Sequence, residues 1–271
     1  MSIRVSPYDL AMETPTSDDL IVEQHDRVAV ITLNRPDRRN ALTHAMVAEL
    51  TTVLERLDGD DGTRAVIVTG SGPGFCAGAD LGGGPSDAEQ TIRRLYTPLI
   101  LAMTRMSTPL IAAVNGIAAG AGCSLALACD TRIAGSSAAF QLSFTRIGLV
   151  PDAGATWLLP RIVGAARASE MALLGRKIGT DDALRWNLVN EVVPADALLA
   201  RAREVAVEMS TLAASSVAAT KRLLHDSFER DLAGQLDAEA TAQGLAQHSE
   251  DFQRTREQFR RRAQERSAVQ P

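Results

Sequence analysis

The stretch PLIAAVNGIAAGAGCSLALACD, residues 109–130, decides the fold class that the sequence predicts. Its first part, 109–116, is an apolar run of the length of a buried strand. A glycine-rich turn over 115–122 follows, and the remainder is predicted to be helical. The first N–H groups of such a helix are unpaired and point outward with the positive end of the helix dipole. The stretch therefore predicts a strand–turn–helix unit with a corner suited to an anion.

Similar units lie on both sides of this stretch. Apolar, β-branched runs predict further strands over 27–33 and 64–70, and a short strand is predicted over 131–135, while residues 188–194 end the mixed part of the chain. Residues 43–57 place their apolar side chains on one face of a helix. Alternation of strands and helices indicates α/β architecture, and from residue 196 the pattern is helical throughout. We therefore expect three segments: a polar N-terminal extension over 1–19, an α/β core over 20–195 and a C-terminal helical region over 196–271.

The composition argues against several classes of function. The chain has 271 residues, 45% of them hydrophobic, and its formal net charge of −5 does not suggest binding to nucleic acid. No apolar run reaches the length of a membrane span, and the N-terminus lacks the pattern of a secretory signal, so we expect a cytoplasmic protein. The three cysteines, Cys76, Cys123 and Cys129, form no CxxC pair and are predicted to be free buried thiols. No cluster of side chains has the spacing of metal ligands.

A second glycine-rich loop, GSGPGFCAGADL, occupies residues 70–81 after a predicted strand. It has neither the Gly-Lys-Ser/Thr of a phosphate-binding loop nor the spacing of a dinucleotide-binding loop. Small residues at 77–79 still let a ligand approach the backbone closely and leave N–H groups free to donate. The loops 77–79 and 115–122 could each supply one N–H group to the same anion, which is the arrangement of an oxyanion hole. The alternative is that both loops are tightly packed turns without a ligand.

One carboxylate stands in an apolar context. Asp152 lies in GLVPDAGAT, residues 148–156, among small and apolar neighbours. Pro-Asp-Ala-Gly is good turn chemistry, and aspartate is also a common helix cap, so one interpretation is purely structural. The other interpretation is a single acid/base group in a dry pocket, where burial would raise its pKa.

Taken together, these stretches resemble the crotonase superfamily, the enoyl-CoA hydratases and isomerases. The resemblance covers nearly the whole chain and rests on motifs in the family's order: VAVITLNRPDRRNAL, GFCAGADL, PLIAAVNGIAAGAGCSLALACD, IGLVPDAGATWLLPRIVG and DFQRTREQFRRRAQER. It implies an α/β fold, a crotonase-like spiral of ββα units with a C-terminal helical trimerisation region, in a homotrimer or a hexamer. It also implies an acyl-CoA substrate, so that coenzyme A is part of the substrate and no separate cofactor is needed. Two backbone N–H groups, those of Ala79 and Ala121, would hold the thioester oxygen as an enolate develops.

The resemblance also implies contacts to coenzyme A. Arg38, in the loop after the first strand, matches a position near the nucleotide end, and Ala77 and Asp80 belong to the loop that lines the thioester. Phe259 and Arg262, on the last helix, match positions that reach the CoA of a neighbouring subunit. The alternative for Arg38 is an exposed loop arginine, and for the last helix a solvated, arginine-rich surface.

Departures from the family's pattern predict the reaction. The two glutamates that activate water in the hydratases correspond to Ser124 and Phe144, and neither residue can act as a base. Asp152 matches a third position, at which isomerases of the family carry a carboxylate. The surrounding motif most resembles the ring-epoxide isomerases of phenylacetate degradation, which are related to the Δ3,Δ2-enoyl-CoA isomerases. An apolar setting that raises the pKa of Asp152 is expected from Leu149, Val150, Phe144 and Trp157.

Two other functions stay open at this point. GCSLA, residues 122–126, follows a strand and opens a helix as the nucleophile of a serine hydrolase does, although it lacks the final glycine and no histidine lies in a recognisable partner context. The chain could also be a catalytically silent protein that binds CoA or a partner, because a fold alone does not establish a function.

Overall fold

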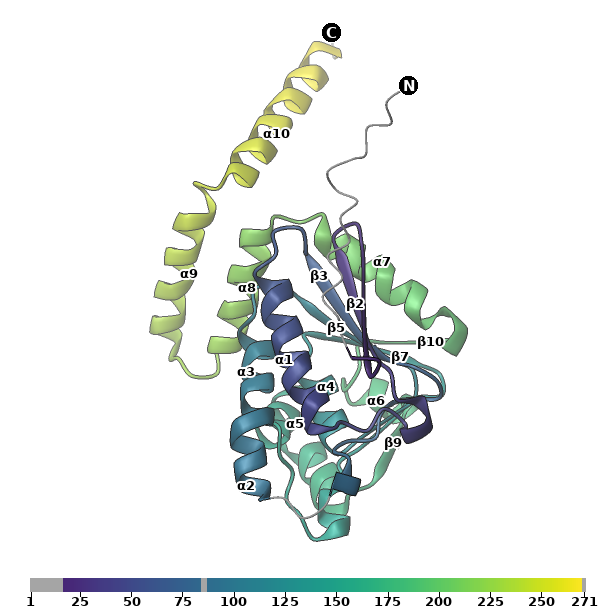
Figure 1. The fold of residues 1–271 in the computed structure, drawn as a ribbon. Helices are drawn as coiled ribbons and strands as arrows, with labels where there is room; N and C mark the ends of the chain where they lie inside the picture. Colours follow the sequence, from purple (N-terminus) through teal and green to yellow (C-terminus); the bar gives the residue numbers. More distant parts are fainter. Residues whose placement is uncertain (1–16, 84–86, 270–271) are drawn as a thin grey trace, which may run out of the picture.

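Figure 1 shows the computed structural model of the chain, which describes residues 17–83 and 87–269. Its larger sheet has six strands in the order β1-β2-β3-β5-β7-β10. They span β1 Leu20–His25, β2 Val28–Leu33, β3 Ala65–Gly70, β5 Leu110–Val114, β7 Thr131–Gly135 and β10 Glu191–Val193. The smaller sheet has four strands in the order β4-β6-β8-β9, which span β4 Gly74–Cys76, β6 Ile117–Ala119, β8 Ala139–Gln141 and β9 Lys177–Gly179. All pairs are parallel except β1 with β2 and β8 with β9.

The helices connect these strands and continue beyond them. They span α1 His44–Asp58, α2 Ala88–Thr91, α3 Thr97–Arg105, α4 Ala121–Ala128, α5 Ala155–Leu174, α6 Thr180–Arg185, α7 Leu198–Ser210, α8 Ala214–Asp226, α9 Leu232–Ala246 and α10 Glu250–Val269. A one-turn π-helix, Ile92–Tyr96, joins α2 to α3. The order β3-β4-α3, then β5-β6-α4, then β7-β8-α5 repeats one strand in each sheet followed by a helix. This repeat is the spiral of ββα units that the sequence predicts.

The large sheet is buried on both faces, which is why its strands are continuous apolar runs. Along β2, Ala29 and Ile31 face one hydrophobic cluster, which includes side chains of α1 and α3. Val28 and Val30 face a second cluster, which includes Leu198 and two alanines of α7, Ala202 and Ala206. Figure 1 shows α7 on one side of the sheet and α1 with α3 on the other. The sheet therefore holds its strand ends, and the loops that follow them, in fixed positions.

The predicted boundary at residue 196 does not separate two folding units. Helix α7 packs on the large sheet as part of its core. Helix α8 is joined to the core by Lys221, whose ammonium lies 2.8 Å from the Asp130 carboxylate and also donates to the carbonyls of Met103 and Thr108. Only α9 and α10 run outside the body of the molecule (Figure 1). Of the predicted N-terminal extension, residues 1–16 lie outside the described residues.

The cysteine prediction is confirmed. Cys76, Cys123 and Cys129 are free and buried, and burial raises the pKa of each thiol to about 12. In the part of the chain that the structure describes, no helix is long and apolar enough to span a bilayer.

Candidate active site

The two glycine-rich loops come into direct contact. Gly78 has a φ of +98°, and a Cβ atom there would lie 2.9 Å from the carbonyl oxygen of Ala119 and 3.3 Å from the nitrogen of Ala121. Gly122 is packed so closely on strand β4 that its Cβ would lie 2.6 Å from Cβ of Cys76. Larger residues at 78 or 122 would push the loops apart, so glycine is required at both.

Each of the two predicted donors has an N–H group without a partner in the described part of the chain. The backbone hydrogen bonds on either side of Ala79 do not use its N–H group. Leu42 N–H donates to the carbonyl of Gly78, and Asp80 N–H donates to the carbonyl of Leu42. Ala121 is the first residue of α4, and the first N–H groups of a helix have no acceptor within it. The structure therefore brings together two loops that each present one free backbone donor.

Asp152 is held next to the start of α4. The Ser124 hydroxyl, in the first turn of α4, donates to the Asp152 carbonyl at 3.1 Å, and Ala155 N–H donates to the same carbonyl at 3.0 Å. The next two residues, Ala153 and Gly154, have φ values of +47° and +77°. A left-handed alanine is strained, and such strain persists only where the surroundings hold it, often at functional sites.

The Asp152 carboxylate is half-buried, and its Oδ1 atom is buried without a hydrogen-bond partner. Burial raises the pKa of this carboxyl to about 6. The cap residue of α5 is Gly154, and no side chain caps that helix. The turn interpretation thus accounts for the backbone of Asp152 and for the hydrogen bond between its carboxylate and its own N–H group, but it leaves the Oδ1 atom without a partner.

The two positions that correspond to the hydratase glutamates carry no acid. Ser124 is completely buried and its hydroxyl reaches two carbonyl oxygens, those of Asp152 and Gly120. Phe144 is buried, and its ring lies 3.9 Å from where a Cβ on Gly120 would be. No histidine in the described residues bonds to Ser124, so the arrangement of a serine hydrolase is not formed.

The sequence model of the enoyl-CoA hydratase/isomerase family matches residues 23–266. The chain belongs to this family. It is 46% identical over 233 residues to a protein of Rhodobacter capsulatus named probable enoyl-CoA hydratase, covering 85% of this chain and 90% of that one. It is 39% identical over 232 residues to the 1,2-epoxyphenylacetyl-CoA isomerase of Escherichia coli, covering 83% and 88%. The crystal structure of an enoyl-CoA hydratase from Bacillus anthracis superposes with a TM-score of 0.85 at 34% identity, covering 90% and 96%.

In this hydratase/isomerase family member, three of the four apolar residues expected around Asp152 are exposed within the single chain. Leu149 and Val150 are 49% and 78% exposed, because Gly148 ends the preceding short helix in a left-handed turn and carries the chain to the surface. Trp157 lies on the side of α5 that faces α8. The Arg161 guanidinium stacks on it, with its Cζ atom 3.9 Å from the centroid of the Trp157 ring. Of the four, only Phe144 is buried as expected, so the burial that raises the pKa of Asp152 does not come from fully buried side chains at 149, 150 and 157.

A residue that the sequence analysis did not single out lies near the carboxylate. Tyr96, from the π-helical turn, is buried, and its pKa is raised by burial and, to a smaller extent, by the charges of Cys76 and Asp152. The tyrosine is therefore within electrostatic reach of the carboxylate. Its sequence context, an aromatic residue at helical spacing, is also typical of an ordinary core residue.

The candidate CoA contacts fall into two groups. Arg38 is exposed and close enough to Asp80 to help lower the pKa of that carboxyl, which is lowered mainly by hydrogen bonds from Gly82 and Arg35. The Asp80 carboxylate is thus occupied: it accepts from Gly82 N–H at 2.9 Å and pairs with Arg35 at 2.8 Å. Ala77 is exposed in the same loop, and its N–H donates to the Arg39 carbonyl.

The other group belongs to α10. Phe259 is 66% exposed there, and α10 runs outside the body that holds Asp152 (Figure 1), so within one chain it does not join the site. The side chain of Arg262 lies outside the described residues. Whether α10 serves a neighbouring subunit stays a prediction.

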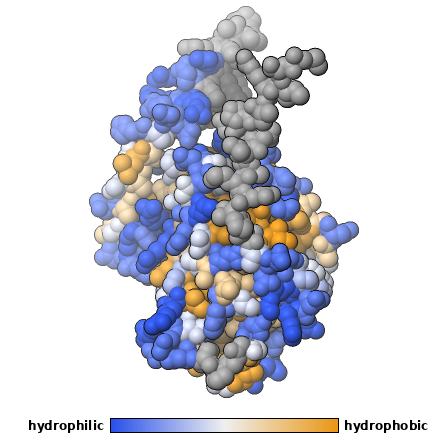
Figure 2. Space-filling view, in the orientation of Figure 1, coloured by the Kyte–Doolittle hydropathy of each residue, from blue (hydrophilic) through white to orange (hydrophobic). Residues whose placement is uncertain are grey.

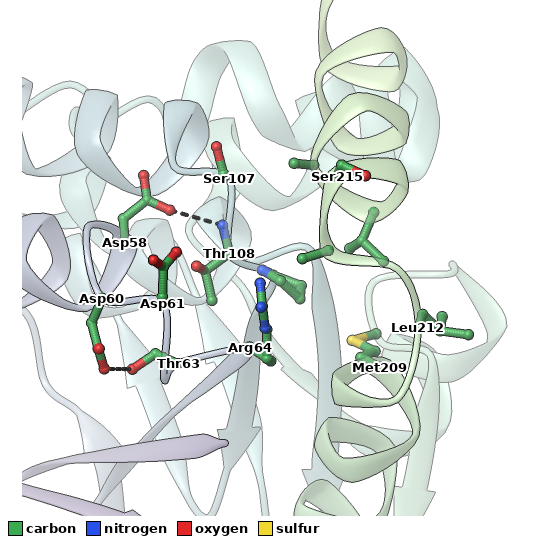
Figure 3. A pocket seen from close by; sticks show the side chains of 14 residues that line it. Asp58, Asp60, Asp61, Thr63, Arg64, Ser107, Thr108, Met209, Leu212 and Ser215 are labelled. Atoms are coloured by element: carbon green, nitrogen blue, oxygen red, sulfur yellow. Dashed lines mark hydrogen bonds between the residues drawn. The ribbon is translucent and has the colours of Figure 1, made fainter. Parts of the chain in front are cut away.

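Other cavities do not provide a competing site. Figure 3 shows one of about 220 Å³ beside the loop 58–64, where two of the lining carboxylates, those of Asp58 and Asp60, already accept hydrogen bonds from the protein. Asp58 accepts from Thr108 N–H at 2.9 Å, and Asp60 accepts from the Thr63 hydroxyl at 2.7 Å. A larger cavity of about 710 Å³ lies between α5 and α8; among its lining residues Lys221 pairs with Asp130, and the buried Arg132 donates to the carbonyls of Leu188 and Cys129. No group of three or more metal-ligating side chains occurs in residues 17–83 and 87–269.

Proposed function

We propose that the protein is an acyl-CoA isomerase that uses Asp152 as its only proton-transfer base. The observation that carries this proposal is a buried carboxylate oxygen without a partner, beside two loops that each present a free N–H group. A raised pKa of about 6 supports it, because a base near neutrality matches the proton it must transfer. The neutral residues at the two hydratase positions, Ser124 and Phe144, favour isomerisation over hydration.

In the proposed reaction, Asp152 removes a proton from one carbon of the acyl group. The electron pair moves toward the thioester, whose oxygen becomes an enolate oxygen and accepts hydrogen bonds from the N–H groups of Ala79 and Ala121. Asp152 then returns the proton to a different carbon on the same face, and the double bond has moved into conjugation. Each donor is expected to contribute about 3–4 kcal/mol to the transition state, by analogy with other oxyanion holes. No other cofactor takes part, and coenzyme A enters as part of the substrate.

Two classes of acyl group are compatible with a single base. Likeness to the 1,2-epoxyphenylacetyl-CoA isomerase of Escherichia coli supports rearrangement of a ring epoxide. The shift of a plain β,γ double bond, as in fatty-acid oxidation, needs the same single base and is the second candidate. A panel of aliphatic and aromatic-epoxide acyl-CoA substrates, followed by mass and ultraviolet absorbance, separates the two.

The test of the proposal is Asp152→Asn, which keeps the size of the side chain but cannot accept the proton. We expect kcat to fall by at least about 10²-fold, the lower limit for a positioned acid/base. Binding of a CoA thioester should stay within a few-fold, because it rests on backbone donors and on contacts to the nucleotide. Asp181→Asn, at an exposed position of α6, is the matched control and should leave kcat unchanged. Full activity of the Asp152→Asn protein would refute the assignment.

A further inference from the structure

Tyr96 presents a buried hydroxyl group that has nothing to bond to. The residue is 4% exposed, and its oxygen has no hydrogen-bond partner. Buried polar groups in native proteins are nearly always hydrogen-bonded, so such an atom calls for an explanation. In the described part of the chain only three side chains have such an atom, those of Tyr96, Asp152 and Trp186.

The backbone places Tyr96 beside the turn that carries Asp152. Tyr96 is the last residue of the π-helical turn Ile92–Tyr96, and π-turns are frequent at functional sites because they redirect the side chains that follow. Ile100 is four residues further on, hence on the same face of the helix. Its Cγ2 atom lies 3.2 Å from where a Cβ on Gly154 would be. The face of α3 that contains Ile100, and that continues back to Tyr96 at the end of the π-helical turn, therefore packs against the turn after Asp152.

We propose that Tyr96 determines specificity by donating a hydrogen bond to an oxygen atom of the acyl group, close to the carbons between which Asp152 moves the proton. This inference rests on the proposed function and narrows its substrate class. The preferred acyl groups would carry an ether, epoxide or enol oxygen near the double bond. A plain hydrocarbon chain would leave the phenol buried and unpaired, and sites built to bond a polar group discriminate strongly against analogues that lack it.

The phenol is suited to donate and not to accept a proton. Burial and the neighbouring charges of Cys76 and Asp152 raise its pKa, so it stays protonated at working pH. A direct hydrogen bond to the Asp152 carboxylate is the other conceivable use of the group. The structure shows no such bond, since the buried Oδ1 atom of Asp152 is itself unpartnered.

Binding of two unreactive thioesters tests the inference. (Tetrahydropyran-2-yl)acetyl-CoA and cyclohexylacetyl-CoA differ by one ring oxygen in place of a methylene, and neither has a double bond to move. By calorimetry, the unmodified protein should bind the ether at least about tenfold more tightly than the hydrocarbon, and Tyr96→Phe should abolish this preference. Thr97→Val removes a hydroxyl from the next, exposed position and should preserve it. Equal affinities in the unmodified protein, or a preference that survives in Tyr96→Phe, would overturn the proposal.

Turnover distinguishes this failure from failure of the proposed function. If no acyl-CoA is isomerised but the ether preference depends on Tyr96, the assignment of Asp152 as the base is refuted and the binding role of Tyr96 is supported. If Tyr96→Phe lowers kcat equally for oxygenated and hydrocarbon substrates and leaves the binding pair unchanged, Tyr96 acts on Asp152 instead and the specificity role is refuted. Thermal melting of each variant shows whether the fold is retained.

Discussion

At the scale of single residues, burial destabilises the ionised form of the Asp152 carboxylate. Its pKa of about 6 in the folded protein exceeds the value of about 3.9 in an unfolded chain. The folded state therefore binds the proton more tightly, and stability falls as pH rises between these two values. Above pH 6 the ionised carboxylate destabilises the fold by its full amount, whereas below about pH 4 it has no such effect.

This linkage predicts that Asp152→Asn melts at a higher temperature than the unmodified protein near neutral pH. The difference should shrink as the pH is lowered toward 4, because the wild-type carboxyl is then neutral as well. Calorimetric melting at a series of pH values measures it. A variant that is less stable than the unmodified protein at neutral pH would contradict this linkage. If Asp152 is the base, the same ionisation should give wild-type activity an acid limb near pH 6.

Residues 124 and 144 lead to a second prediction, on hydration. With a serine and a phenylalanine in place of both water-activating glutamates, turnover of crotonyl-CoA should be negligible against a typical enzyme rate of about 10 s⁻¹. Ser124→Glu should not create the activity, because residue 144 still lacks a carboxylate. The structure adds a reason: Ser124 is completely buried and bonded to the Asp152 carbonyl, so a longer acid would displace the turn. Loss of absorbance of crotonyl-CoA at a typical rate would contradict the assignment.

At the scale of elements, the site depends on contact between two loops. Gly78→Ala introduces a methyl group 2.9 Å from the Ala119 carbonyl at a φ of +98°, so the loops must separate and the two N–H donors lose their common target. We expect a fall in kcat of about 10²-fold, the loss typical of one oxyanion donor. Gly164→Ala also imposes a positive φ but meets no atom within 4 Å, and it should retain kcat while lowering stability. Steady-state kinetics and melting of both variants give the comparison.

Prediction of elements from sequence succeeded where burial produces long patterns. Strands β2, β3 and β7 lie within a residue of the expected ranges, and in β2 and β3 burial on both faces produces nearly continuous apolar runs. The strands of the small sheet were not predicted, since three residues carry no periodicity.

The same physical limit applies to the site. The glycine loops and the lone carboxylate are visible in the sequence because their residue types are unusual for their context. The exposure of Leu149 and Val150 is not visible, because apolar residues look alike in a core and on a surface. Neither is the unpaired hydroxyl of Tyr96, since its state depends on which atoms other elements bring near it.

At the scale of the whole molecule, the C-terminal helices leave much apolar surface uncovered. Large apolar side chains of α8 to α10 and their connections are 45% to 75% exposed: Leu224, Phe228, Leu232, Leu236, Leu245, Phe252 and Phe259. Figure 2 shows apolar patches within the hydrophilic surface, one of them over α9. Exposed apolar surface of this extent marks an interface more often than a solvated face. This supports the expectation of a homotrimer or a hexamer.

Charge substitution on α9 tests that expectation. Leu245→Glu places a carboxylate on the apolar surface and should shift the assembly toward monomers in light scattering at micromolar concentration. Gln243→Glu adds the same charge two residues away, at an exposed polar position, and should leave the assembly intact. A monomeric wild-type protein at that concentration would refute the expectation.

The three buried thiols can be used to measure local unfolding of the protein. Their sulfur atoms are enclosed and their pKa values are raised to about 12, so alkylating reagents cannot react with the native conformation at neutral pH. A thiol can then be labelled only when the structure around it unfolds transiently. The labelling rate therefore reports the free energy of that local unfolding. Cys76 lies directly under the contact between the two loops, against Gly122. Its protection by a bound thioester would therefore measure how far substrate locks the strand beneath the reacting oxygen.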